Sequence, residues 1–215
     1  MKLADYTELW QSLGLDLEAH DGLLRTLGQA YKEIYLSQKN RPAGMDYFDF
    51  VISEIHGLRI RELAEARKEG RMVVGTFCLY VPEELVLALD GIAVGLCAGA
   101  DVGTEAAEQV LPRNTCALIK SFFGFKLSGL CPYTEVCNLV IGETTCDGKT
   151  KAYELFNEYK PTFVIEVPRM KSPAARALWR SELGRLAAKL EELSGQPLTA
   201  EKLSAAVRTV NAKRA

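Results

Sequence analysis

The chain has 215 residues, of which 48% are apolar and 25% charged, the balance of a globular protein with one sizeable core. Its 26 basic and 28 acidic residues leave a net charge of -2, which argues against a nucleic-acid partner. No stretch approaches the roughly 20 apolar residues of a membrane span, and the acidic N-terminal stretch lacks a signal peptide's apolar core. We therefore expect a cytoplasmic protein with no membrane partner.

The first part of the chain carries helical periodicity. Large apolar side chains recur at three- and four-residue intervals over 1–40 and again over 45–69, with a break containing Pro and Gly between them. Gly70 follows the second run, where glycine suits the left-handed residue that ends many helices. We expect an N-terminal helical segment over 1–70.

From residue 71 onward, short apolar runs alternate with helical patterns. The apolar runs, typical of strands buried on both faces, lie at 72–78, 91–99, 137–145 and 161–170. The helical patterns lie at 81–90, 103–111, 114–125, 148–159, 172–195 and 199–215. This alternation predicts an α/β fold, a parallel Rossmann-like sheet flanked by helices, over 71–195, with a C-terminal helical extension over 196–215.

Six cysteines lie in the α/β part, and in a reducing compartment they favour metal binding or catalysis over disulfides. Cys78 and Cys97 end apolar strands, so we interpret both as buried, inert thiols. Cys116 follows Asn114 and Thr115, two good N-cap residues, so we expect it in the first turn of a helix. The helix dipole there favours a thiolate, which can ligate metal or act as a nucleophile.

Three further cysteines fall within sixteen residues of one another. Cys131 precedes a proline in an expected loop, and Cys137 begins an expected strand, where a core role and a functional role are equally open. Cys146 lies in a strand-to-helix turn whose backbone amides can donate to sulfur. Such a turn lies at the carboxyl edge of a parallel sheet, where these folds bind ligands.

Zinc is the first alternative for such a set of thiols. Successive spacings of 15, 6 and 9 residues from Cys116 to Cys146 do not match the close cysteine pairs of structural zinc sites. The two histidines, His20 and His56, lie far upstream, and we interpret them as surface or interhelical residues. Spacing alone is compatible with an iron–sulfur cluster without establishing one.

Two acidic residues near the last thiol are weak catalytic candidates. Glu143 and Asp147 could deliver protons beside a reduced cluster. The preferred interpretation makes Asp147 a helix N-cap and Glu143 a solvent-facing residue at a strand end. Lys149 and Lys151 are interpreted as a solvated surface. No P-loop and no dinucleotide-binding fingerprint is present, so ATP is not bound here through a P-loop.

Three segments together resemble a known family. They are "VPEELVLALDG" (81–91), "NTCALIKSFFG" (114–124) and "GLCPYTEVCNLVIGETTCDGKTKAYELF" (129–156). They are similar to the 2-hydroxyacyl-CoA dehydratase and benzoyl-CoA reductase family, and within it most similar to the double-cubane-cluster reductases. The likeness runs from about residue 45 to about residue 195 and is specific, because it preserves several unusual residues in order.

The resemblance implies two similar α/β domains that both contribute thiolates to an iron–sulfur centre. It makes Cys116 and Cys146 the first ligand candidates, Cys131 the third and Cys137 the fourth. The implied cofactor is a [4Fe-4S] or a double-cubane [8Fe-9S] cluster, and the implied partner is a separate ATP-hydrolysing iron–sulfur activator. Dehydratases of the family form a ketyl radical on a CoA thioester, whereas the reductase branch acts on small or unidentified substrates.

Members of this family are close to twice the length of this chain, which corresponds to their N-terminal half. Either the chain is a fragment or a truncated gene product, or the second half comes from another chain or from a homodimer. The preferred function is the iron–sulfur component of an ATP-driven anaerobic reductase or 2-hydroxyacyl-CoA dehydratase. The alternative is a truncated, cluster-free half-domain with only a structural or partner-binding role.

Overall fold

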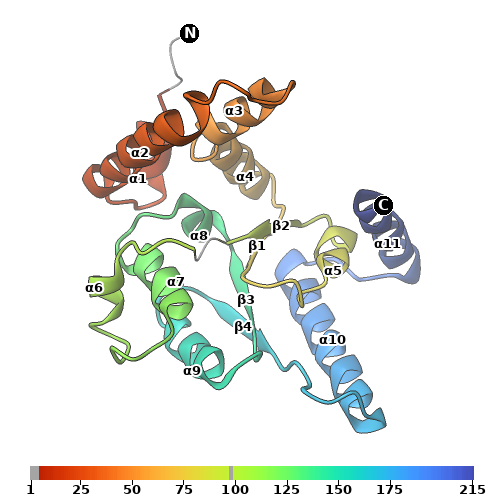
Figure 1. Ribbon diagram of the computed structural model, residues 1–215. Coiled ribbons are helices and arrows are strands. Elements are labelled where there is room, and N and C mark those ends of the chain that lie inside the picture. The colour runs from red at the N-terminus through yellow and green to blue at the C-terminus, as the bar shows by residue number, and fades with distance from the viewer. Residues whose placement is uncertain (1–4, 97–98) are drawn as a thin grey trace.

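The structure is a computed structural model that describes residues 5–96 and 99–215 (Figure 1). At its centre lies a sheet of four parallel strands in the order β2-β1-β3-β4. The strands are β1 (Val73–Thr76), β2 (Ile92–Gly95), β3 (Leu139–Glu143) and β4 (Thr162–Ile165). Helices flank the sheet, so the α/β class predicted from the sequence is confirmed.

Helical elements precede the sheet, connect its strands and follow it. Before β1 come α1 (Thr7–Ser12), α2 (Leu17–Tyr31), the π-helical turn η1 (Lys32–Leu36), α3 (Met45–Ser53) and α4 (Leu58–Lys68). Between the strands lie α5 (Glu83–Ala88), α6 (Thr104–Ala107), α7 (Ala117–Leu127), α8 (Pro132–Val136) and α9 (Asp147–Phe156). After β4 come α10 (Pro173–Ser194) and α11 (Ala200–Arg214).

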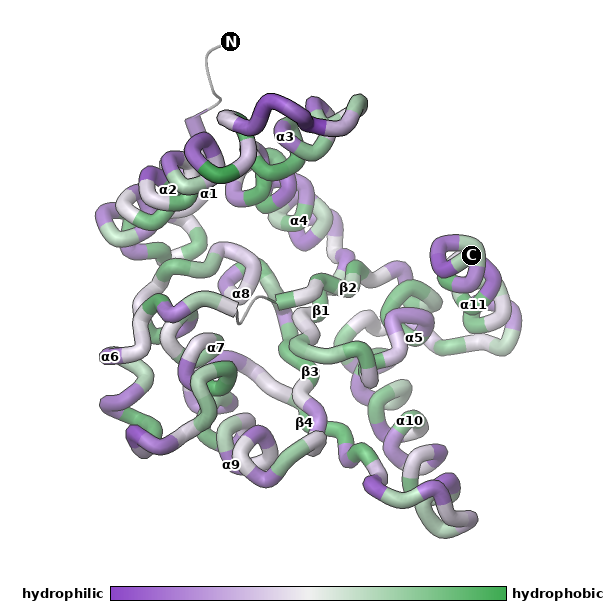
Figure 2. The backbone as a smooth tube through the Cα atoms, in the orientation of Figure 1, coloured by the Kyte–Doolittle hydropathy of each residue, from purple (hydrophilic) through white to green (hydrophobic). Residues whose placement is uncertain are grey.

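The two faces of the sheet bury two separate cores, because alternate residues of a strand point to opposite faces. Val73 and Val140 pack with α4, α7 and α9 on one face. Val74, Leu139 and Ile141 pack with α5 and α10 on the other. Every residue of β3 is buried, as expected for a central parallel strand covered on both faces. Figure 2 shows the hydrophobic residues that run along this strand.

The N-terminal region is helical as predicted, but both of its long helical patterns are interrupted. The first is divided at 13–16, where Gly14 has a φ of 77° and the Asp16 carboxylate accepts from the Ala19 N–H to begin α2. The second is divided before Gly57, where a Cβ would lie 2.2 Å from the Tyr6 ring. A contact with a residue some fifty positions away ends α3, and no local pattern records it. Gly70, with a φ of 87°, lies just beyond α4 as expected.

Most elements are shorter than the ranges expected from the sequence, and the differences around the cysteines and β4 matter most. The expected loop at Cys131 contains the short helix α8, which Pro132 opens at its first position. β3 begins at Leu139, so Cys137 lies before the strand instead of starting it. β4 ends at Ile165, because the chain then turns through Pro168 toward α10. Cys97 lies outside the described residues.

None of the helices described by the structure is both long and apolar enough to cross a membrane. The division of the chain at residues 70 and 195 into separate segments stays a prediction.

Candidate iron–sulfur site

The sheet order places a switch point between β1 and β3. From β1 the chain crosses to β2 on one side, whereas from β3 it crosses to β4 on the other. In open parallel sheets the crevice at such a point, beyond the carboxyl ends of the strands, is the usual place for a ligand. Cys78 follows β1 by two residues and Cys146 follows β3 by three. Two thiols therefore flank the position where this fold binds ligands.

Cys146 is exposed and begins helix α9 as its N-cap. Its Sγ accepts a hydrogen bond from the backbone N–H of Lys149 at 3.4 Å. A sulfur at a helix N-terminus lies near the positive end of the helix dipole, and an N–H donor stabilises the same negative charge. The exposed sulfur and its backbone donor suit a metal ligand. Asp147 was predicted to be the N-cap of this helix, but it is the first residue of α9, and Cys146 is the N-cap.

Cys116 is also exposed and is itself the N-cap of α7. The sequence predicted that Asn114 or Thr115 would cap this helix, but both precede the capping position, so the thiol lies one residue before the first turn. Helices α7 and α9 meet at their first turns, because a Cβ on Gly148 would lie 3.0 Å from Ile119 Cδ1 and 4.0 Å from Cys146 Sγ. The structure thus brings together the helix starts that carry Cys116 and Cys146.

Cys131 and Cys137 lie at the opposite end of β3 and are buried. The Cys137 thiol donates to the Tyr133 carbonyl at 3.0 Å, and its sulfur would lie 3.0 Å from a Cβ on Gly75 in the core. Burial raises the pKa of Cys137 to about 12, so the thiol stays protonated near neutral pH. Because β3 rises about 3.3 Å per residue, its five residues separate these two thiols from Cys146 by the length of the strand.

The described residues contain no group of three or more His, Cys, Asp or Glu side chains arranged to hold a metal ion. Cys78 is half-buried, in partial agreement with the inert role predicted for it. The two histidines form an interhelical pair, His20 Nε2 to His56 Nδ1 at 3.0 Å, and His56 packs edge-on against the ring of Tyr133. Any cluster held at Cys116 and Cys146 therefore needs ligands beyond those that the described chain brings to this edge.

A buried polar network lies beneath Cys146. Glu143, the last residue of β3, is completely buried and forms an ion pair with Lys149. Its second oxygen accepts from the Tyr153 hydroxyl at 3.3 Å. Burial, together with the Glu143 charge, raises the pKa of Tyr153, and the nearby Cys78 and Cys146 add to the effect. The predicted solvent-facing positions of Glu143 and Lys149 are wrong, because the side chains fold inward and neutralise one another.

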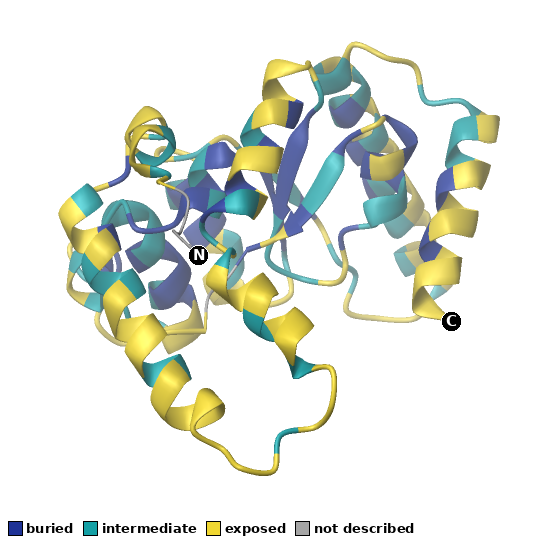
Figure 3. Cartoon of the chain, turned by 90° about the horizontal axis from the view of Figure 1, so that it is seen from above, coloured by how far each residue is buried: buried dark blue, intermediate teal, exposed yellow. Residues whose placement is uncertain are grey.

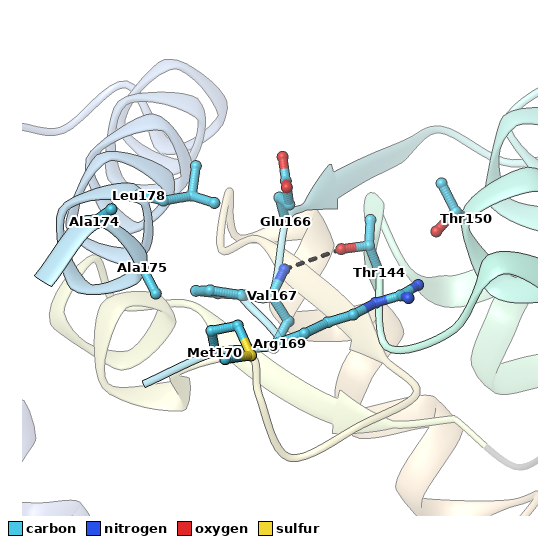
Figure 4. A pocket seen from close by; sticks show the side chains of 10 residues that line it. Thr144, Thr150, Glu166, Val167, Arg169, Met170, Ala174, Ala175 and Leu178 are labelled. Carbon is cyan, nitrogen blue, oxygen red and sulfur yellow. Dashed lines mark hydrogen bonds between the residues drawn. The ribbon is translucent and has the colours of Figure 1, made fainter. Parts of the chain in front are cut away.

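A cleft of about 500 Å³ opens beside this network (Figure 4). Thr144 and Glu166, the first residues after β3 and β4, line it together with Arg169. The Thr144 hydroxyl accepts from the Val167 N–H at 3.0 Å and so ties the two strand ends together. The volume lies within the range of about 300–1,000 Å³ typical of small-molecule sites. Arg169 also pairs with Asp147, which joins the cleft to the start of α9.

Comparison with known proteins assigns the chain to a family. Residues 78–215, more than half of the sequence, match the family model of the 2-hydroxyglutaryl-CoA dehydratase D-component. The chain belongs to this family. It is 40% identical over 174 residues to YjiM of Escherichia coli (strain K12), which carries the name of a dehydratase subunit. It is also 26% identical over 150 residues to the (R)-phenyllactyl-CoA dehydratase beta subunit of Clostridium sporogenes.

These matches cover 80% and 67% of this chain, but only 44% and 39% of the two relatives. The chain therefore spans about half the length of the curated dehydratase relatives it matches. The family match includes all six cysteines and begins at Cys78, after β1. The family resemblance inferred from the sequence is confirmed.

Sequence reasoning missed Lys149, Tyr153 and Arg169 as parts of this dehydratase-family site. A signal for Lys149 was available, since it lies one helical turn after Cys146 on a helix that starts at the carboxyl edge of the sheet. Tyr153 follows one turn later, so its ring lies along the same side of α9. Arg169 gave no comparable signal, because its position depends on the turn after β4.

Proposed function

We propose that this chain is the iron–sulfur-binding component of an anaerobic 2-hydroxyacyl-CoA dehydratase or related low-potential reductase. As the family resemblance implies, electrons would come from a separate ATP-hydrolysing iron–sulfur activator. The activity would reside in the cytoplasm, where thiols stay reduced. Membership of the dehydratase family supports the reaction class.

The observation that carries the proposal is the pair of exposed thiols at two touching helix starts. Cys116 caps α7 and Cys146 caps α9, and the first turns of these helices meet at Ile119 and Gly148. Both sulfurs lie at helix N-termini, and the Cys146 sulfur accepts a backbone hydrogen bond. Iron–sulfur clusters are held by thiolates, so these two residues fit the cofactor.

In this proposal Cys116 and Cys146 hold the cluster, which when bound supplies one-electron transfer. Hydrogen bonds to ligand sulfurs and burial tune the potential of such centres, and the Lys149 N–H is one such donor. Glu143 holds the Lys149 ammonium and thereby orients the first turn of α9. The neighbouring cleft offers space for a small-molecule substrate.

Cys131 and Cys137 remain the further ligand candidates, but their burial at the opposite end of β3 means that they would have to move to join the same centre. A second function, a cluster-free half-domain, is favoured by one observation. The described residues hold no group of three side chains ready to bind metal. The two functions differ in whether the isolated chain takes up iron.

Iron and acid-labile sulfide should be measured after anaerobic reconstitution of the wild-type chain and of Cys116→Ala, Cys146→Ala and Cys137→Ala. We expect iron uptake in the wild type and in Cys137→Ala, with thiols of the reconstitution mixture completing the ligand set, and loss of iron in the two exposed-thiol variants. Circular dichroism would check that each variant folds. An iron-free wild-type chain would favour the cluster-free function, and iron loss in Cys137→Ala alone would move the site to the buried thiols.

A further inference from the structure

The cleft beside the buried polar network combines two opposite charges with an apolar wall. Glu166 and Arg169 line it, and both residues are exposed. The apolar residues of the lining are Val167, Pro168, Met170, Ala174, Ala175 and Leu178. Every residue from Glu166 to Met170 is exposed or half-buried, whereas every residue of β3 is buried. Figure 3 shows this contrast between the buried centre of the sheet and the more exposed segments around it.

Hydrogen bonds fix the backbone of the cleft before any ligand binds. The Glu182 carboxylate of α10 accepts from the Glu166 N–H at 2.9 Å, and the Thr144 hydroxyl accepts from the Val167 N–H at 3.0 Å. Glu182 is itself buried and forms an ion pair with Arg185 at 2.6 Å. Preorganised groups lose less conformational freedom when a ligand binds. The segment between β4 and α10 therefore presents its side chains from a defined position.

The two charged side chains of the cleft do not pair with each other. Figure 4 shows the Glu166 carboxylate and the Arg169 guanidinium apart, with no interaction drawn between them. Within residues 5–96 and 99–215, the Glu166 carboxylate has no hydrogen-bond or ion-pair partner, and the Arg169 guanidinium pairs only with Asp147, through Nη2. The side chains of that pair are 69% and 91% exposed, and such surface pairs contribute little to stability. Both charges of the cleft are thus available to a ligand.

We infer that the cleft binds a zwitterionic α-amino acid with a short apolar side chain. The planar fork of the Arg169 guanidinium matches the two oxygens of a carboxylate. Glu166 complements an ammonium group, and the apolar wall suits an aliphatic side chain. Met170 is 73% exposed, and its flexible thioether can pack against side chains of different shapes.

The lining disfavours ligands that carry a single charge. A simple carboxylate brings its charge close to Glu166, and a simple amine brings its charge close to Arg169, so each meets one repulsive group. A zwitterion offers a complementary group to both side chains. An α-hydroxy acid keeps the carboxylate, but its neutral hydroxyl forms a weaker hydrogen bond with Glu166 than an ammonium group does.

The inference concerns the cleft alone. The lining residues that the structure describes include no cysteine, so binding of an amino acid does not depend on the proposed cluster. It can be measured on the full chain without iron. Failure of the binding test would leave the proposed function standing, and failure of iron uptake would leave the amino-acid site standing.

An amide NMR titration of the isotope-labelled wild-type chain tests the inference, because the amides that shift locate the ligand. Four probes share a linear aliphatic chain. They are norvaline (both enantiomers, tested separately), valerate without the ammonium, butylamine without the carboxylate, and 2-hydroxyvalerate with a hydroxyl in place of the ammonium. At millimolar concentrations one enantiomer of norvaline should shift the amides of Thr144 and Val167. It should bind about tenfold more tightly than the other three probes, the effect of one charge-assisted hydrogen bond.

Two substitutions assign each charge of the ligand to its partner. Arg169→Gln should weaken norvaline and valerate about tenfold without weakening butylamine, whereas Glu166→Gln should weaken norvaline and butylamine about tenfold without weakening valerate. Arg176→Gln and Glu158→Gln, at exposed charges outside the cleft, are the matched controls and should bind norvaline as the wild type does. Norvaline shifts that are absent or confined to other parts of the chain, 2-hydroxyvalerate that binds as tightly as norvaline, or equal effects of cleft and control substitutions would overturn the inference.

Discussion

The buried histidine pair predicts that acid destabilises the N-terminal helices. His20 is completely buried, and its Nε2 lies 3.0 Å from Nδ1 of His56. The Nδ1 atom of His20 has no hydrogen-bond partner among residues 5–96 and 99–215. Trp10 packs edge-on against His20 with ring centroids 4.5 Å apart, and its indole N–H donates to the His56 carbonyl. A proton on either ring would be a buried charge with little compensation.

The magnitude follows from the pKa of His56. Burial, and secondarily the neighbouring His20, lowers it from 6.5 to about 4, and burial also lowers the pKa of His20. Below pH 6.5 the unfolded chain therefore binds a proton that the folded chain rejects, and stability falls with pH until the folded pKa is reached. At ~1.4 kcal/mol per pH unit, His56 alone should remove about 2 kcal/mol between pH 7 and pH 5.

Urea unfolding should be followed at pH 7, 6 and 5 by tryptophan fluorescence in a Trp179→Phe background, so that Trp10 alone reports. Carboxylates mostly stay ionised over this range, and a His20→Gln, His56→Gln variant in the same background corrects for those that do not. We expect the variant to lose about 2 kcal/mol less stability than the parent over this range, by the same linkage. Equal slopes in parent and variant would refute the reasoning.

Three other predictions concern the sheet and the buried side chains. Glu143→Gln leaves the Lys149 ammonium buried without its counter-ion, so the unfolding free energy should fall by about 3–5 kcal/mol. A loss below ~1 kcal/mol in a denaturant titration would contradict a buried pair. Gly142→Ala places a Cβ 2.6 Å from the Tyr153 ring and should destabilise the fold by about 1–3 kcal/mol, whereas an unchanged melting temperature would show that the ring moves freely. In the folded chain at pH 8, Cys137 should resist iodoacetamide until denaturant is added, and rapid labelling detected by peptide mass spectrometry would disprove its raised pKa and burial.

The sheet was predictable because its strands are continuous apolar runs separated by helical patterns, a signal that depends on local sequence alone. The same locality explains the errors. From the sequence, Glu143 was interpreted as a solvent-facing residue at a strand end, but in the structure Lys149 and Tyr153 cover it. The helix break before Gly57 occurs where Tyr6 packs against that glycine. The burial of Glu143 and the break before Gly57 therefore depend on contacts with residues further along the chain, which local sequence patterns do not record.

The candidate site was predictable only in part. The turn after β3 was expected to present Cys146 at the carboxyl edge of the sheet, and the structure places it there. The position of Cys131 was not predictable, since Pro132 reads equally well as a loop residue or as the first residue of a helix. The helical pattern of residues 45–53 was visible, but periodicity does not reveal that no residue of α3 is buried among the described residues.

The position of the Cys146 sulfur, at the start of α9, is fixed by β3, in which every residue is buried. β3 is buried along its whole length, and three residues after it Cys146 already caps the next helix. Because the Cys146 thiol lies between a buried strand and a helix, its backbone has little conformational freedom. If the proposed cluster binds here, stripping its metal with a chelator should leave Cys146 in place, and reloading should proceed without refolding of the sheet.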